Sequence, residues 1–201
     1  MINRKFFFDT VREKQFGGQL SQSQVDGMST ILNEWEENLP NADDRWLAYM
    51  LATAFHETAR TMQPIREFGG PKYFFRMYDK DGERPQVAKD LGNTKAGDGV
   101  KFHGRGFVQL TGRANYKKMK DLLNVDLIDD PDLAMDTEVA SNIMFKGMNE
   151  GLFTGKKLSD YFNDSEENWF EARRIINKLD KAEMIEGYAL TFYAATSYTT
   201  G

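Results

Sequence analysis

Apolar residues recur at helical spacing along most of the chain, and this pattern restricts the fold to a mainly helical class. Residues 21–38 show the pattern clearly, because their apolar side chains fall on one face of a helix. That stripe consists of Val25, Met28, Ile31, Leu32 and Trp35. The same spacing predicts further helices over residues 4–15, 45–62, 112–123, 137–150, 156–162, 168–177 and 181–196.

Residues 64–106 interrupt this helical pattern. Gly, Pro and Asp are frequent there, and the long apolar patch in the segment is limited to residues 73–75. We expect a loop-rich excursion with room for a short β-hairpin near residues 75–88, since functional loops in compact domains are often this long. The 201 residues are enough for one domain, with helices in residues 1–40 packed onto the rest.

The residue content excludes several kinds of active site. The chain has no Cys, so it has no disulfide and no thiol nucleophile, and its two histidines are too few for a three-histidine zinc site. His56 and Glu57 begin like a zinc-peptidase motif, but Arg60 stands where the second histidine is required. Residues 79–83 lack the Gly and Glu spacing of a calcium loop. We therefore expect no metal and no cofactor.

Charge is unevenly distributed along the chain, whose net charge is −5. Residues 101–125 hold six basic side chains against one acidic side chain, and residues 126–138 hold only acidic ones. These segments are either two solvated surfaces or a basic wall beside an anionic or sugar substrate. Neither resembles the dominant basic face of a nucleic-acid binder, so no nucleic-acid partner is expected.

The apolar runs are too short for a membrane segment. None approaches 18 residues, so we expect no stable membrane insertion. The first apolar stretch stops at Asp9, which is too early for the core of a signal peptide. We therefore expect the protein to be held in the cytoplasm of the cell that makes it.

Glu57 is the most unusual residue, because it ends a helix that is otherwise suited to burial. Leu47, Met50 and Ala54 share its helical face, and the rest of the helix is nearly all apolar. An apolar setting and the negative end of a helix dipole both favour a protonated carboxyl, as a general acid requires. The alternative is a structural ion pair with Arg60 or with a distant arginine.

A second carboxylate, Glu67, lies in a segment expected to be a hydrated loop. One buried and one hydrated carboxylate form the acid and base pair of a glycosidase. The alternative is a solvated loop glutamate beside Arg66. The glycine-rich segment 97–116 follows, with neutral hydrogen-bonding side chains that suit sugar hydroxyls. Thr111 also fits the N-cap of the next helix.

Three blocks of sequence resemble glycoside hydrolase family 19, which holds chitinases and the lysozyme-like endolysins of bacteriophages. They are residues 55–59, residues 104–116 and, more weakly, residues 172–177. The resemblance runs from about residue 43 to residue 195. It implies a mainly helical, lysozyme-like catalytic domain over residues 1–201, with two lobes around a cleft lined by residues 64–106. It also implies hydrolysis with inversion and without a metal.

The resemblance implies a role for each matching residue. Glu57 matches the general acid, Glu67 the general base, and Thr111 the residue that helps to hold the attacking water. The sugar-binding set comprises Gln109, Asn115, Tyr116, Asn177 and Arg105. Within this set, Arg105 is expected to act mainly by fixing the loop through its guanidinium. Lys178 follows Asn177 where the family has a glycine, which puts the local backbone in doubt.

The departures from the family favour its phage and bacterial branch. Plant members use disulfides, whereas this chain has no Cys and little room for extra substrate loops. We therefore expect a monomeric endolysin of muramidase type that cuts the β-1,4 bond of peptidoglycan strands once a separate membrane lesion releases it. The alternatives are a chitinase acting on chitin, a transglycosylase, and a wall-binding module without catalysis.

Overall fold

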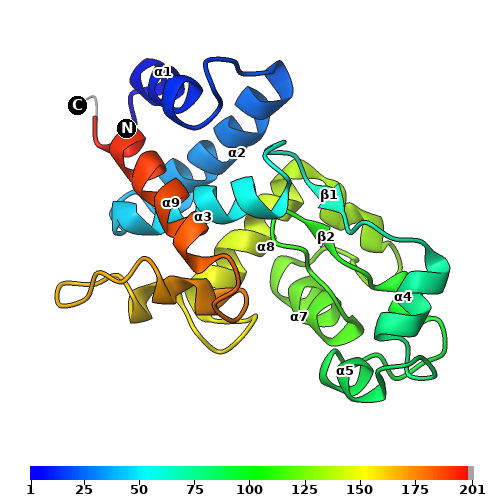
Figure 1. Cartoon of the computed structure of the whole chain (residues 1–201). Coiled ribbons are helices and arrows are strands. Elements are labelled where there is room, and N and C mark those ends of the chain that lie inside the picture. Colours follow the sequence, from blue (N-terminus) through cyan, green and yellow to red (C-terminus); the bar gives the residue numbers. More distant parts are fainter. Residues whose placement is uncertain (199–201) are drawn as a thin grey trace. The chain divides into compact units, whose positions relative to one another are not determined.

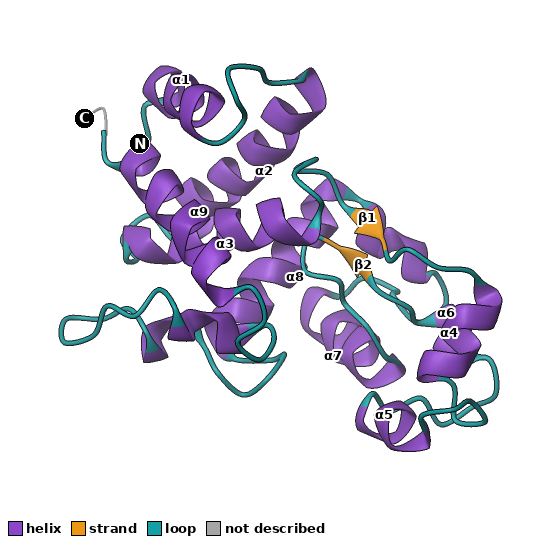
Figure 2. Cartoon of the chain, in the orientation of Figure 1, coloured by secondary structure: helices purple, strands orange, loops and turns teal. Residues whose placement is uncertain are grey.

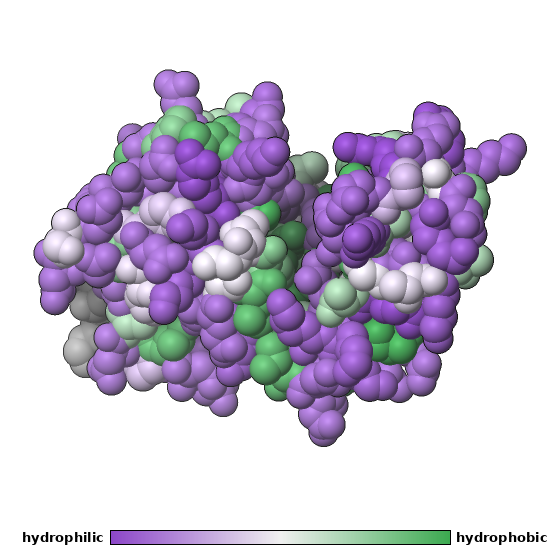
Figure 3. Space-filling view, turned by 90° about the horizontal axis from the view of Figure 1, so that it is seen from below, coloured by the Kyte–Doolittle hydropathy of each residue, from purple (hydrophilic) through white to green (hydrophobic). Residues whose placement is uncertain are grey.

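The computed structural model describes residues 1–198, and it confirms the mainly helical fold class. Helices account for most of the regular structure in this range, and one pair of two-residue strands forms its β-structure (Figure 2). None of the described helices is long and apolar enough to cross a membrane. Hydrophilic side chains cover most of the face shown in Figure 3.

The chain divides into two compact units. The terminal unit consists of Met1–Gln63 together with the chain from Met144 onward, and the middle unit consists of Pro64–Ile143. Helix α8 (Thr137–Glu150) begins in the middle unit and ends in the terminal unit. Glu57 therefore lies in one unit and Glu67 in the other.

The terminal unit is built around α3 (Asp44–Glu57). Every residue from Leu47 to Phe55 is buried, so this helix has no solvent-facing side. The long helix that packs along it is α9 (Ala182–Thr196) (Figure 1). Helix α1 (Arg4–Lys14) packs against α9, and α2 (Gln22–Asn38) packs against α3.

Helix α3 ends at Glu57, five residues before the predicted end at residue 62. The Thr58 hydroxyl donates to the Ala54 carbonyl at 2.7 Å, and the backbone of Ala59 and Arg60 then turns left-handed, with φ of 50° and 69°. Left-handed residues cannot continue a right-handed helix. The prediction overshot because it took Pro64 as the helix stop, whereas the chain leaves the helix at Thr58.

Two other predicted helices are reduced to single turns of 3₁₀ helix. Residues 156–162 contain only Leu158–Asp160, and residues 168–177 contain only Glu171–Ile175. In the second stretch Trp169, Ala172, Arg173 and Ile175 are buried. Trp169 lies in the turn before this 3₁₀ helix, not on a helix as expected.

The middle unit holds short elements around a minimal sheet. Strand β1 (Ile65–Arg66) pairs antiparallel with β2 (Arg105–Gly106), with Ile65 opposite Gly106. The predicted hairpin near residues 75–88 is wrong, because that region holds the end of α4 (Pro71–Tyr78) and most of α5 (Pro85–Asp90). Both helices begin with a proline, whose fixed φ suits the first helical position. The unit is completed by α6 (Asp98–Lys101), α7 (Arg113–Leu123) and a 3₁₀ helix over Pro131–Met135.

Buried polar side chains order the part of the middle unit that has little regular structure. The Asp79 carboxylate is fully buried and accepts backbone N–H groups of Gly97 and Gly99 at 2.8 and 3.2 Å. Asp98 forms a two-pronged ion pair with Arg113 at 2.5 and 2.7 Å. Burial alone would raise the pKa of the Asp98 carboxyl, but its bonds from Arg113 and from backbone amides lower it.

Close packing at Gly27 of α2 gives a stability prediction. A Cβ at this position would lie 1.7 Å from the Met62 carbonyl oxygen, whereas a Cβ at Gly187 of α9 would meet nothing within 4 Å. Gly27→Ala should lower the free energy of unfolding by about 2–3 kcal/mol through overpacking. Gly187→Ala should raise it by up to about 1 kcal/mol, because alanine favours helix. Chemical unfolding measures both, and equal effects would contradict the packing of α2 on residue 62.

Candidate functional site

In the terminal unit, an arginine from the last third of the chain holds Glu57. The Glu57 Oε1 atom accepts a hydrogen bond from Arg173 Nη1 at 2.8 Å, and the side chains are 18% and 3% exposed. Arg173 Nε also donates to the Asp180 carbonyl at 2.9 Å, which fixes the plane of the guanidinium. The structure therefore shows the ion pair with a distant arginine that the sequence left as an alternative.

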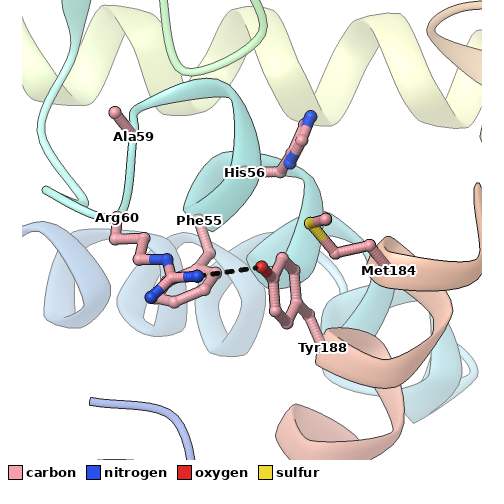
Figure 4. Close-up of a pocket in the computed structure, with 6 residues that line it drawn as sticks. All are labelled: Phe55, His56, Ala59, Arg60, Met184 and Tyr188. Carbon is pink, nitrogen blue, oxygen red and sulfur yellow. Dashed lines mark hydrogen bonds between the residues drawn. The ribbon is translucent and has the colours of Figure 1, made fainter. Parts of the chain in front are cut away.

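Beside the end of α3 lies a pocket of about 270 Å³. It is lined by Phe55, His56, Ala59, Arg60, Met184 and Tyr188 (Figure 4). Burial lowers the pKa of the His56 imidazole, and the charge of Glu57 opposes that shift. The pocket thus adjoins Glu57 along the chain and is lined by a largely neutral imidazole and one arginine.

In the middle unit, both carboxylate oxygens of Glu67 accept hydrogen bonds. Oε1 accepts from the Tyr78 hydroxyl at 2.7 Å, and Oε2 accepts from the Gly104 backbone N–H at 3.2 Å. Burial and the bond to Glu67 raise the pKa of the Tyr78 phenol, so Tyr78 remains a donor. Glu67 is half-buried and held in place, which differs from the freely hydrated loop residue expected from the sequence.

The guanidinium of Arg105 ties the glycine-rich loop together. Arg105 is 5% exposed, and its Nη1 donates to the carbonyls of Lys101 and His103 at 3.1 and 3.0 Å. Its Nε donates to Asp132 at 2.8 Å. These contacts give Arg105 the loop-fixing role expected from its guanidinium.

Tyr116, which was expected to bind sugar, lies in the interior of the middle unit. Its side chain is fully buried, and its hydroxyl donates to the His103 carbonyl at 3.0 Å while accepting from Arg105. Burial raises the pKa of the phenol to about 12. Its side chain therefore supports the loop and does not reach a surface that a sugar can contact. Its helical position was a usable signal, because Tyr116, Met119 and Leu123 fall at the spacing of one apolar helix face.

A chain of hydrogen bonds connects the remaining polar residues of this loop. Asn115 Nδ2 donates to the Thr111 carbonyl, and the Thr111 hydroxyl donates to the Gln109 carbonyl, both at 2.8 Å. Gln109 has a left-handed backbone, with φ of 54°, and its Nε2 donates to the Ile65 carbonyl at 3.0 Å. The loop thereby holds three half-exposed polar side chains in one arrangement beside β1.

Gly104 is the point at which Glu67 and Gln109 come together. A Cβ on Gly104 would lie 2.8 Å from Gln109 Oε1 and 3.1 Å from Glu67 Oε2. Both oxygens therefore border the same small space. The structure brings together Glu67, Gln109 and the Thr111 segment in the middle unit.

Asn177 lies in the terminal unit with an exposed side chain, whose Oδ1 accepts the Lys178 N–H at 2.8 Å.

Two partners of the carboxylates, Arg173 and Tyr78, were not predicted from the sequence. The pair of adjacent arginines at 173 and 174 in an apolar stretch was a usable signal, because one of them had to turn inward. Tyr78 gave none, since it lies eleven positions after Glu67. Within residues 1–198 no cluster of three His, Cys, Asp or Glu side chains is arranged to hold a metal ion.

The two neighbouring arginines provide a matched stability test. Arg173→Ala removes the partner of a largely buried carboxylate and should lower the free energy of unfolding by about 2–4 kcal/mol. Arg174→Ala removes a side chain that is 44% exposed and pairs with Glu171, so the loss should stay within about 0.5 kcal/mol. Denaturant unfolding of both variants checks this, and similar losses would contradict the special position of Arg173.

Comparison with known proteins places the chain in a family. The family model for glycoside hydrolase family 19, described as chitinase class I, matches residues 37–148, which is more than half of the chain and includes Glu57, Glu67 and residues 104–116. No curated protein matched the sequence.

Solved structures share the fold. A bacterial family 19 chitinase is 20% identical with a TM-score of 0.67, and the match covers 100% of this chain and 97% of that one. Chitinase C from Streptomyces griseus HUT6037 is also 20% identical, with a TM-score of 0.65 and coverage of 100% and 78%. A match over this length to the family model, supported by the shared fold, identifies the protein as a glycoside hydrolase that belongs to family 19.

Proposed function

We propose that this enzyme hydrolyses the β-1,4 glycosidic bond of bacterial peptidoglycan with inversion, as an endolysin of muramidase type. The observation that carries the proposal is the contrast between its two carboxylates. Glu57 has one oxygen held by a nearly buried guanidinium, and its other oxygen makes no hydrogen bond within residues 1–198. Glu67 has donors on both oxygens. Two carboxylates in different settings suit opposite proton-transfer roles.

Glu57 is assigned the general acid. A proton carried on the free Oε2 would pass to the glycosidic oxygen as the bond to the anomeric carbon breaks. Glu57 is then left as a carboxylate, and the adjacent Arg173 charge stabilises this product of the transfer. Arg173 therefore supports the step as a positioning residue.

Glu67 is assigned the general base. One oxygen accepts from Tyr78 and the other from the Gly104 amide, and each oxygen keeps a lone pair for the attacking water. The Thr111 hydroxyl donates its proton to the Gln109 carbonyl, so its oxygen is left to accept a hydrogen bond from that water. With substrate bound, inversion requires the two carboxyl groups to stand about 6.5–9.5 Å apart, with the water on the side of Glu67.

The packing of the tryptophans favours peptidoglycan over chitin, because a chitinase cleft is expected to offer more tryptophan rings for stacking on sugars. Trp35 and Trp169 are 3% and 5% exposed, and the Trp46 indole N–H donates to the Phe162 carbonyl. The tryptophans thus serve packing within the terminal unit. Chitin is the second candidate substrate, because the similar solved structures are described as chitinases. Under the leading proposal the enzyme acts at the bacterial cell wall.

Replacing the proposed acid tests the assignment. Glu57→Gln should lower the rate of wall lysis by about 10²–10⁴-fold, the usual contribution of a general acid. Glu183→Gln, an exposed acidic residue in the first turn of α9, is the control and should leave the rate unchanged. Loss of turbidity of purified walls measures both. Retention of half the wild-type rate by Glu57→Gln would contradict the assignment.

The reaction products separate the remaining alternatives. Inverting hydrolysis of a β-linked chain should release reducing ends that are initially the α-anomer, which proton NMR detects before mutarotation. Mass spectrometry of the digested wall should show fragments that gained one water, with muramic acid at the reducing end. An anhydro sugar would indicate a transglycosylase, and release from chitin oligomers without any from walls would indicate a chitinase.

A further inference from the structure

The backbone that carries Arg60 is held in an unfavourable conformation. Ala59 and Arg60 both have left-handed φ values, 50° and 69°, although neither is glycine. Residues with a Cβ rarely adopt this conformation, because the Cβ atom crowds the following carbonyl oxygen. Hydrogen bonds compensate, since the Arg60 N–H donates to the Phe55 carbonyl at 2.8 Å and Gln24 donates to the Arg60 carbonyl at 3.0 Å. Strain that the surroundings maintain in this way is typical of binding sites.

Arg60 has no acidic partner among residues 1–198, in contrast to most arginines of the chain. Its Nη2 donates instead to the neutral Tyr188 hydroxyl at 3.3 Å. Its guanidinium lies over the Phe55 ring, 5.6 Å from the ring centre (Figure 4). The stacked guanidinium therefore keeps N–H groups available for an anion.

The lining of the pocket suits an anionic group on a short apolar arm. Figure 4 shows Arg60 and Tyr188 joined by a hydrogen bond on one side, with His56 and Met184 on the other. No carboxylate lines the pocket. Glu57 and Asp180 are the acidic groups whose charges act on His56, and Arg173 and Lys181 act on it with the opposite sign.

We propose that this pocket binds a carboxylate on the peptide arm of the amino-sugar chain, and that Arg60 thereby selects peptidoglycan over chitin. This inference rests on the proposed function. Two parallel N–H bonds from a guanidinium match the two oxygens of a carboxylate, and the Tyr188 hydroxyl supplies a further donor. Met184, whose side chain is 44% exposed, accommodates the aliphatic part of the arm. Chitin carries no such arm, so it gains nothing from this pocket.

The test compares one variant on three substrates. Arg60→Gln should lower kcat/KM on peptide-bearing wall glycan by about 10–100-fold, the range for a lost hydrogen bond to a charged group. The loss should appear mainly in KM. The variant should keep the wild-type kcat/KM on wall glycan stripped of its peptides by an amidase and on chitin oligomers. Arg12→Gln on α1, whose arginine pairs with Asp9, is the matched control and should be unchanged on all three.

A second variant tests the pocket without changing Arg60. Met184→Glu places a carboxylate in the pocket at a side chain that is 44% exposed, so the fold should tolerate it. It should give the same selective loss on peptide-bearing glycan. Equal losses on all substrates, or no loss with either variant, would overturn this inference alone. A wild-type enzyme that cuts chitin oligomers but neither wall glycan would overturn the proposed function and this inference with it.

Discussion

Complete burial of α3 is the constraint on which the rest of the terminal unit depends. A helix whose residues from Leu47 to Phe55 are all inaccessible needs other elements on every side, and α2 and α9 supply two of them. The helix leaves this burial at His56 and Glu57, which are partly exposed. The position of the proposed acid is thus fixed by the length of the apolar helix, and Arg173 provides the charge that such a position requires.

The middle unit is ordered in a different way, because it has almost no sheet and only short helices. Its loops are held by buried polar side chains that bond directly to backbone groups. The Asp79 carboxylate accepts hydrogen bonds from two glycine amides, and the Arg105 guanidinium donates to two backbone carbonyls. Such networks fix a loop only when every member is satisfied. Glu67 benefits from this, since the same loop presents the Gly104 amide to its carboxylate.

The sequence predicted the long helices well, because their apolar spacing reports burial directly. The prediction failed where a few residues outweighed the apolar pattern. Thr58 and the two left-handed residues after it ended α3 early. Pro71 and Pro85 each begin a helix in the region where a hairpin was expected. For the candidate site, the motif blocks singled out Glu57 and the residues around Gln109, and the expected loop carboxylate singled out Glu67; their roles stay predictions. The partners Arg173 and Tyr78 required the fold, because sequence spacing carries no information about which distant donors meet a carboxylate.

The absence of a side chain at Gly104 makes this position a means of adjusting the site without removing any functional group. Its φ is not in the left-handed region, so the backbone itself accepts alanine. The added methyl group would lie 2.8 Å from Gln109 Oε1, 3.1 Å from Glu67 Oε2 and 3.2 Å from Glu67 Cβ, so both side chains would have to shift. An alanine at residue 104 would therefore change the spacing of these two oxygens while both side chains keep their identity.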